Sequence, residues 1–265
     1  MSGTSERDLP DALKAFDAIE ARLADRRPFL CLDYDGTLTP IVAQPELAVI
    51  DLDARATLGE VGRVCPTAIV SGRALEDVRR LVGVPWLYYA GNHGFEIEGH
   101  GLSLDVGREY EALMAEVRDA LAPRLADMPG ILLEDKGCTL SVHYRHASER
   151  VLPAFYSAVD TLLIERPRLA GRMGKKVLEI RPAVDWHKGR AVRWLHERID
   201  RDAVPIFIGD DLTDEDAFEV IADDGIGVLV SETPRMTKAH FRIPDVDAVY
   251  RLLARIGAHA VRAAA

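Results

Sequence analysis

The first residues that could do chemistry are two carboxylates, Asp33 and Asp35, which directly follow the apolar run 29–32. Side chains at positions i and i+2 lie on the same side of an extended chain, and Gly36 lets the backbone turn close to a bound group. Two neighbouring carboxylates suit a hard cation such as Mg²⁺, which prefers oxygen ligands. The alternative is an ordinary turn rich in Asp and Gly.

A second acidic cluster, residues 209–216, follows the apolar run 204–208. Thr213 and the three acids after it suit the start of a capped helix, so those acids could be structural. Asp210 and Asp211 precede that cap, and metal ligation is the better interpretation for both.

Two further positions could hold an anion. Ser71 follows the apolar run 67–70 and precedes a predicted helix, so its hydroxyl either caps that helix or meets an anion together with the first helical amides. Lys188 lies in the first turn of a helix predicted to begin near Asp185, where the helix dipole disfavours a cation. A positive charge there favours a bound anion, although an exposed lysine would cost little.

The elements that must position these residues indicate an α/β chain. Three runs, 29–32, 67–70 and 204–208, are apolar on both faces, end in turn residues and alternate with helical patterns, as strands of a buried parallel sheet do. Ligands bind at the carboxyl ends of such strands, so the three segments should converge on one place. The predicted fold is a doubly wound, Rossmann-like parallel-sheet core, preceded by an amphipathic helix over residues 8–25.

The middle of the chain predicts an inserted α+β domain, with residues 107–183 in it and residues 1–106 and 184–265 in the core. Residues 1–27 would hold the leading helix. Other predicted elements are a hairpin-like stretch over 95–104, helices over 108–126 and 148–165, a hairpin of 131–136 with 138–145, and a strand over 176–181.

Composition excludes several partners. The 265 residues include 43 Asp plus Glu and 33 Lys plus Arg, a net charge of −10, which argues against nucleic acid and against a polybasic membrane-surface protein. No apolar run approaches the roughly 18 residues of a membrane span, and the first residues lack a hydrophobic export core, so we expect a cytoplasmic protein. Cys31, Cys65 and Cys138 are too far apart for a zinc cluster and are predicted to be buried thiols.

Four motifs together resemble those of the haloacid dehalogenase (HAD) superfamily phosphohydrolases. In chain order they are Asp33-x-Asp35-Gly36-Thr37, Ser71-Gly72-Arg73, Lys188, and Gly209-Asp210-Asp211-x-x-Asp214. The longer strings LDYDGTLTPI (32–41), GNHG (91–94), VHYR (142–145), EIRP (179–182) and GDDLTDED (209–216) are similar to those of the trehalose-6-phosphate phosphatases. The resemblance extends over residues 28–235, and we expect no synthase domain ahead of it.

This resemblance implies a catalytic role for four residues. Asp33 would be the nucleophile that forms an aspartyl-phosphate, and Asp35 would protonate the departing sugar oxygen and then activate water. Neighbouring carboxylates push one another's proton affinities apart, which supports this division, and covalent catalysis splits one difficult displacement into two steps. Ser71 and Lys188 would hold the phosphate oxygens.

The resemblance also implies a Mg²⁺ site. Asp33, the Asp35 carbonyl and Asp210 would bind the metal, with Asp211 and Asp214 orienting the site. For Asp214, simple helix capping stays an equal alternative.

The inserted domain is expected, by the same resemblance, to act as a cap over the sugar. Glu134, Lys136 and Glu179 match family residues that grip the distal glucose; from the residues alone, a solvated hairpin tip and an exposed strand face are the alternatives. Arg145, predicted to share a strand face with His143, would contact an anion. The remaining substrate-binding candidates are Gly36, Thr37 and Arg73. Asn92 and His93 receive no firm role.

The implied activity is Mg²⁺-dependent hydrolysis of trehalose 6-phosphate to trehalose and phosphate. We expect a monomer whose partner is this small sugar phosphate rather than nucleic acid or membrane. One alternative is a phosphatase for another sugar phosphate, such as sucrose 6-phosphate. Another is a sugar-phosphate sensor without catalysis, but the replaced nucleophile or metal ligand expected of a sensor is absent from the sequence.

Overall fold

The computed structural model describes residues 9–42, 45–174 and 176–263. They form two compact units, one built from the chain up to Leu104 and from Trp186 onward, the other from Asp105–Asp185. Within the described ranges, no helix has both the length and the apolar character needed to cross a membrane.

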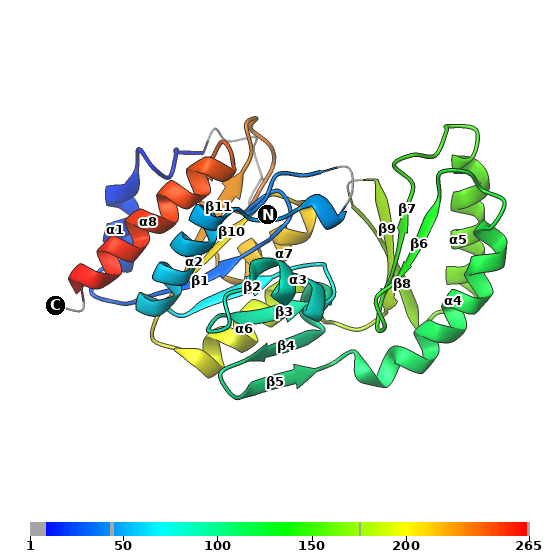
Figure 1. Ribbon diagram of the computed structural model, residues 1–265, viewed down its shortest axis with the longest axis horizontal. Coiled ribbons are helices and arrows are strands. Elements are labelled where there is room, and N and C mark those ends of the chain that lie inside the picture. The colour runs from blue at the N-terminus through cyan, green and yellow to red at the C-terminus, as the bar shows by residue number, and fades with distance from the viewer. Residues whose placement is uncertain (1–8, 43–44, 175, 264–265) are drawn as a thin grey trace. The chain divides into compact units, whose positions relative to one another are not determined.

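The first unit is built on an eight-stranded sheet in the order β12-β11-β10-β1-β2-β3-β4-β5 (Figure 1). The strands from β12 to β3 pair in parallel, and β4 pairs with β3 in the antiparallel sense. This confirms the predicted doubly wound parallel core. The strands are β1 (Pro28–Leu32), β2 (Thr67–Val70), β3 (Tyr88–Gly91), β4 (Glu96–Gly99), β5 (Leu102–Asp105), β10 (Val204–Gly209), β11 (Ile226–Val230) and β12 (Phe241–Ile243).

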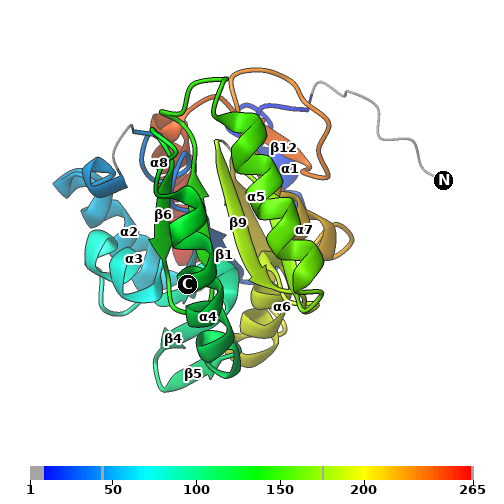
Figure 2. The same cartoon turned by 90° about the vertical axis from the view of Figure 1, so that its right-hand side faces the viewer.

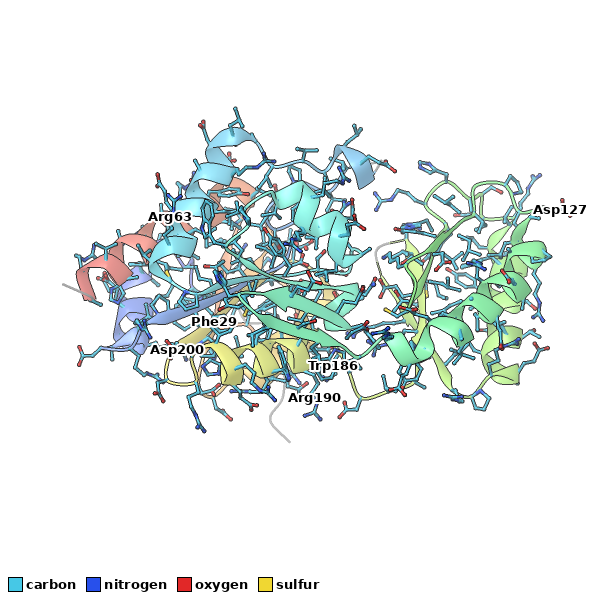
Figure 3. All side chains as sticks on the ribbon, turned by 60° about the horizontal axis from the view of Figure 1, so that its bottom comes forward. Phe29, Arg63, Asp127, Trp186, Arg190 and Asp200 are labelled. Atoms are coloured by element: carbon cyan, nitrogen blue, oxygen red, sulfur yellow. The ribbon has the colours of Figure 1, made fainter. Side chains whose placement is uncertain are left out.

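Helices cover both faces of this sheet. Leu30 and Leu32 of β1 point into a core that includes side chains from four helices, whereas Phe29 and Cys31 point into a second core with side chains of two others; Phe29 is labelled in Figure 3. The first set is α1 (Phe16–Leu23), α2 (Leu52–Val64), α3 (Leu75–Val82) and α8 (Val246–Ala263), and the second is α6 (Lys188–Ile199) and α7 (Glu215–Val220). Burial on both faces explains the uninterrupted apolar runs of the central strands.

The chain reverses its direction of travel across the sheet between β1 and β10. From β1 it moves outward through β2 and β3, and after the second unit it returns to β10 and moves outward on the other side through β11 and β12. Ligands of doubly wound sheets bind at the carboxyl ends of the strands beside this switch point. Short 3₁₀ turns complete the unit: η1 (Pro45–Leu47), η2 (Asn92–Gly94) and η4 (Leu212–Asp214).

The second unit is an antiparallel four-stranded sheet with two helices on one face (Figure 2). The helices bury apolar side chains against the sheet, with Phe155 and Val142 both fully buried in the resulting core. The elements are η3 (Arg108–Tyr110), α4 (Glu111–Leu125), β6 (Leu132–Asp135), β7 (Leu140–His143), α5 (Leu152–Glu165), β8 (Leu169–Met173) and β9 (Val177–Pro182), in the sheet order β6-β7-β9-β8.

The leading helix is shorter than predicted. It begins at Phe16 rather than near residue 8, because the preceding segment pairs with β12: Ala12 N donates to Arg242 O, and Arg242 N donates to Pro10 O. The part of the predicted helix before residue 9 lies outside the described residues. The three cysteines are free and buried, as predicted.

Phe155→Ala should destabilise the second unit by about 3–5 kcal/mol, because the ring is fully buried between α5 and the sheet. The three tryptophans lie in the first unit, so their fluorescence does not report this unfolding. Amide hydrogen exchange of peptides from β6 to β9 measures it instead. Ile164→Ala, on the same helix but 82% exposed, is the control and should change the free energy of unfolding by less than about 0.5 kcal/mol. Equal protection in both variants would contradict the assigned core.

Candidate active site

The carboxyl ends of β1 and β10 bring the two acidic motifs together. These strands are parallel neighbours, with Leu32 opposite Ile208, and Asp33 N donates to Ile208 O at 2.9 Å. Asp33 follows β1 and Asp210 follows β10, so both carboxylates leave the sheet at one edge. The strand register explains why residues so far apart in the sequence meet.

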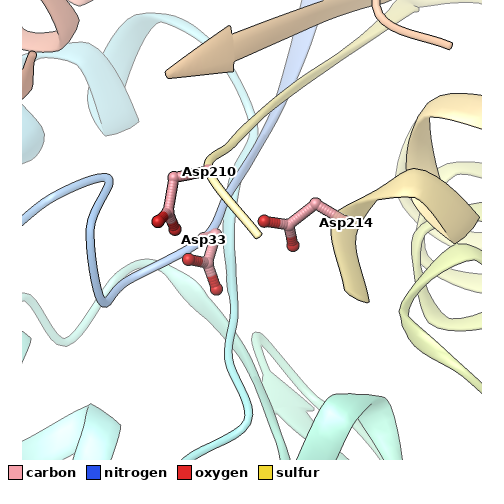
Figure 4. A group of neighbouring side chains, drawn as sticks. All are labelled: Asp33, Asp210 and Asp214. Carbon is pink, nitrogen blue, oxygen red and sulfur yellow. The ribbon is translucent and has the colours of Figure 1, made fainter. Parts of the chain in front are cut away.

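Asp33, Asp210 and Asp214 form a buried carboxylate cluster. One oxygen of each lies within 4.8 Å of the others, and Figure 4 shows the three side chains turned toward one another. The three residues are 4%, 8% and 0% exposed, respectively. Carboxylate oxygens gathered in this way are the ligands that Mg²⁺ prefers.

Lys188 pairs with two of these carboxylates. Its Nζ donates to Asp33 Oδ1 at 2.6 Å and to Asp214 Oδ1 at 2.7 Å, and its side chain is 3% exposed. The alternative of an exposed lysine is therefore wrong. Lys188 is the first residue of α6, within the predicted first turn, although the helix begins there rather than near Asp185.

The charges of the cluster are unequal, because Lys188 offers one positive charge to three carboxylates. Burial alone would lower the pKa of Lys188, but Asp214 and Asp33 outweigh burial and raise that pKa above its ordinary value. Burial raises the pKa of Asp33 well above its usual range; Lys188 opposes this rise, and Asp214 and Asp210 add to it. A divalent cation among these oxygens would counter the repulsion and favour ionised Asp33, so the donor set fits Mg²⁺.

The turn after β10 is held by Asp211 and Asp214. Asp211 is the N-cap of η4 and forms a capping box with Asp214, in which Asp211 N donates to Asp214 Oδ2 at 2.9 Å. The prediction that Thr213 provides the cap is therefore wrong. This capping role explains the carboxylate of Asp211 without a bound metal. The three-carboxylate cluster contains Asp214 and does not contain Asp211.

Gly36 and Thr37 shape the turn after Asp33. Gly36 has a φ of +86°, and a Cβ there would collide with the Asp210 carboxylate, so only glycine fits. Thr37 is fully buried, and its Oγ1 finds no hydrogen-bond partner among the described residues. Buried hydroxyls are normally satisfied, which points to a polar group supplied by a ligand.

Asp35 lies outside the carboxylate cluster. Arg73 Nε and Nη2 donate to its two carboxylate oxygens, each at 2.7 Å, and the Asp35 side chain is 43% exposed. This placement leaves the carboxylate of Asp35 for a role other than metal binding.

Ser71 belongs to a turn that is fixed from two sides. Its Oγ accepts a hydrogen bond from Arg73 N at 3.1 Å, whereas the N-cap of α3 is Ala74, so the interpretation of Ser71 as that cap is wrong. Asn92 N donates to Arg73 O at 2.7 Å and His93 N donates to Ser71 O at 2.9 Å. The turns after β2 and β3 therefore hold each other in place.

In the second unit, the sheet brings Glu134, Lys136 and Glu179 together. The register places Ser141 between Glu134 and Glu179, and Lys136 Nζ lies 4.0 Å from a carboxylate oxygen of each. The Lys136 and Glu179 side chains are only 9% and 13% exposed, so a solvated hairpin tip and an exposed strand face do not describe them. Glu134 is more open.

Arg145 does not share a strand face with His143, contrary to the prediction. The strand β7 ends at His143, and Arg145 lies beyond it in an exposed turn closed by the bond from Ala147 N to Tyr144 O. His143 Nε2 instead lies 2.8 Å from Glu134 Oε2.

Sequence reasoning missed Arg235 altogether. Its Nη2 donates to Asp211 O at 3.1 Å and to Glu215 Oε1 at 3.2 Å, which ties the segment after β11 to the turn after β10. An arginine in a polar loop gives no sequence signal of such a contact, since the contact depends on how two distant loops pack.

Comparison with known proteins identifies a family for the chain. The trehalose-phosphatase family model matches residues 31–247. The chain is 40% identical to trehalose-phosphate phosphatase B of Arabidopsis thaliana, covering 93% of this chain and 71% of that protein. It is 39% identical to the probable trehalose-phosphate phosphatase 4 of Oryza sativa subsp. japonica, covering 94% and 71%.

The fold is shared with a solved structure, the C-terminal domain of trehalose-6-phosphate phosphatase from C. albicans, with a TM-score of 0.80, 21% identity, and coverage of 96% of this chain and 99% of that one. The sheet-edge carboxylates with Lys188, the family match over most of the chain and the close relatives lead to one conclusion: the chain belongs to the trehalose-phosphatase family.

Proposed function

We propose that the chain hydrolyses trehalose 6-phosphate to trehalose and inorganic phosphate through a phosphorylated Asp33. The observation that carries this proposal is the Asp33 carboxylate at the sheet edge, bonded to Lys188 and next to Asp210. The names of its relatives supply the substrate.

In the first step an Asp33 oxygen attacks phosphorus. Lys188 holds Oδ1 and so fixes the plane of the carboxylate. As the Asp33 oxygen–phosphorus bond forms, the bond from phosphorus to the sugar oxygen breaks, and Asp35 gives that oxygen a proton. Asp35 suits this task because its carboxylate lies two residues away and is partly open to solvent.

In the second step water hydrolyses the aspartyl-phosphate. Asp35, now ionised, takes a proton from the water, whose oxygen attacks phosphorus and releases Asp33. Ser71 and Lys188, both buried at the same edge, would hold phosphate oxygens in both steps, and the buried hydroxyl of Thr37 is a further donor.

Asp33 and Asp210 are the residues that would hold Mg²⁺, together with the carbonyl of Asp35. When bound, Mg²⁺ would offset the repulsion between the carboxylate nucleophile and the phosphate. Asp214 orients the site, because one of its oxygens accepts from Lys188 and the other from Asp211 N.

The polar group of the second unit suits a sugar. Glu134 and Glu179 can accept hydrogen bonds from hydroxyl groups, and Lys136 between them can donate. A site built to hydrogen-bond a particular set of hydroxyls rejects sugars that lack them. The proposal therefore assigns recognition of the glucose ring to these residues, with Arg145 as an anion contact.

Asp33→Asn should abolish turnover, with kcat at least about a thousandfold lower, because an amide cannot form the acyl-phosphate. Phosphate release from trehalose 6-phosphate measures it, and acid-quenched labelling of the protein should detect the intermediate in the parent alone. Asp127→Asn, at an exposed residue of the second unit (Figure 3), is the control. Parent-like turnover by Asp33→Asn would refute the covalent mechanism.

Removal of divalent metal with a chelator should stop phosphate release, and added Mg²⁺ should restore it. Asp210→Asn should raise the Mg²⁺ concentration for half-maximal activity by at least about tenfold, because one carboxylate ligand is lost. Calorimetric titration of Mg²⁺ into the protein gives the same comparison without turnover. Full activity in chelator would exclude the metal role.

A panel of trehalose 6-phosphate, sucrose 6-phosphate and glucose 6-phosphate tests the substrate. We expect the highest kcat/KM for trehalose 6-phosphate. Glu179→Gln should raise the KM for trehalose 6-phosphate by roughly ten- to a hundredfold, since a hydrogen bond to a charged group contributes about 1.5–3 kcal/mol. Glu149→Gln, at an exposed position of the same unit, is the control and should leave this KM unchanged. No preference within the panel would contradict the assigned substrate.

A further inference from the structure

We propose that Arg73 and Asp77 are positioning residues that act through Asp35: together they hold the carboxylate that exchanges protons with the sugar oxygen and with water. The inference deepens the proposed function and rests on it for the role of Asp35. It is based on a continuous set of ion pairs that leads from Asp35 into helix α3.

Arg73 grips Asp35 in a geometry that fixes orientation. Nε and Nη2 donate to the two carboxylate oxygens at 2.7 Å each, a parallel double hydrogen bond that only a planar guanidinium makes. The Asp35 side chain is 43% exposed and the Arg73 side chain only 11%. A half-exposed carboxylate would sample several rotamers without such a partner, so the buried arginine supplies the order that Asp35 lacks.

Arg73 is itself held on its other edge. Nη1 donates to Asp77 Oδ2 at 3.0 Å, and the guanidinium lies over the Tyr34 ring at 5.3 Å. The Tyr34 hydroxyl donates to Ala48 O at 2.6 Å in the core. Asp77 belongs to α3, so the arginine is tied to a helix and to a buried ring rather than to a mobile loop.

The backbone of the arginine is fixed as well. Arg73 O accepts from Asn92 N, and Ser71 O accepts from His93 N. Asn92 and His93 both have a positive φ, 48° and 57°, a backbone conformation that residues other than glycine rarely adopt. Such strain persists only where the surroundings enforce it, and it concentrates at functional sites. Here it places two amides against the turn that carries Arg73.

The chemistry predicts what a loosened Asp35 would do. Proton donation matters most when the leaving oxygen is strongly basic, as in a sugar, and least when it is a stable anion such as p-nitrophenolate. A misplaced acid therefore makes kcat/KM depend more steeply on leaving-group basicity. A residue that binds the sugar directly, or that only stabilises the fold, does not change this dependence.

The test measures kcat/KM for a series of aryl phosphates of increasing leaving-group basicity, and for trehalose 6-phosphate, in Arg73→Lys and Asp77→Asn. We expect a loss of about ten- to a hundredfold for trehalose 6-phosphate and less than about threefold for p-nitrophenyl phosphate, with a steeper slope across the series. Asp77→Asn should show the smaller effect, because it acts through Arg73. Arg79→Gln, on the same helix and paired with exposed Glu98, is the matched control and should keep the parent slope.

A double-mutant cycle with Asp35→Asn separates the possible outcomes. If Arg73 acts through Asp35, Arg73→Lys should cost less than about threefold once Asp35 is an asparagine. Equal losses on all substrates, an unchanged slope with a raised KM for the sugar phosphate, or fully additive losses in the cycle would each overturn the inference while leaving the proposed function intact. Parent-like kcat/KM of Asp35→Asn on trehalose 6-phosphate would instead remove the acid role of Asp35, and the inference with it.

Discussion

The pairing of Lys188 with Asp33 and Asp214 is the interaction on which the rest of the site depends. A buried ammonium is stable only with its charge compensated, and buried carboxylates need the same. Lys188 donates hydrogen bonds to two of the three acids in the cluster, and its single positive charge compensates part of their negative charge. They also explain why Asp214 is fully buried, and they leave a charge imbalance that a divalent cation would complete. The ammonium of Lys188 thus serves both the folding of this sheet edge and its chemistry.

The topology makes this pairing possible across a long stretch of chain. Lys188 and Asp33 are separated by 155 positions, and the whole second unit lies between them in the sequence. The chain can leave after β5 and return at α6 because the return strand, β10, pairs with β1 in register. The carboxylates of Asp33 and Asp210 then lie close together because β1 and β10 are neighbouring strands, and this proximity does not require the inserted unit. An inserted unit can therefore carry residues for the substrate while the reacting groups stay on the sheet.

Sequence patterns predicted what depends on local periodicity and missed what depends on packing. The strands β1, β2 and β10 were predictable because apolar runs flanked by turn residues are typical of buried strands. Strand β8 was missed, since a glycine and an arginine interrupt its short sequence. The motif residues were found by order and type, but the cap of η4 was assigned two residues late, because Thr213 and Asp211 are both good capping residues. The double hydrogen bond between Arg73 and Asp35 joins residues 38 positions apart, and no spacing rule predicts it.

Net charge was an incomplete guide to the ligand, and the structure explains why. The acids outnumber the bases and give a net charge of −10, which by itself disfavours an anionic substrate. Yet Asp33, Asp210 and Asp214 are gathered out of solvent, in a cluster whose oxygens could hold a cation. Both carboxylate oxygens of Asp35 accept hydrogen bonds from Arg73. The field that a phosphate meets is set by these local pairs, because interactions in a buried site are screened far less than those of the exposed acids. A surplus of surface carboxylates and a site for an anion are thus compatible whenever the acids nearest the anion are already engaged.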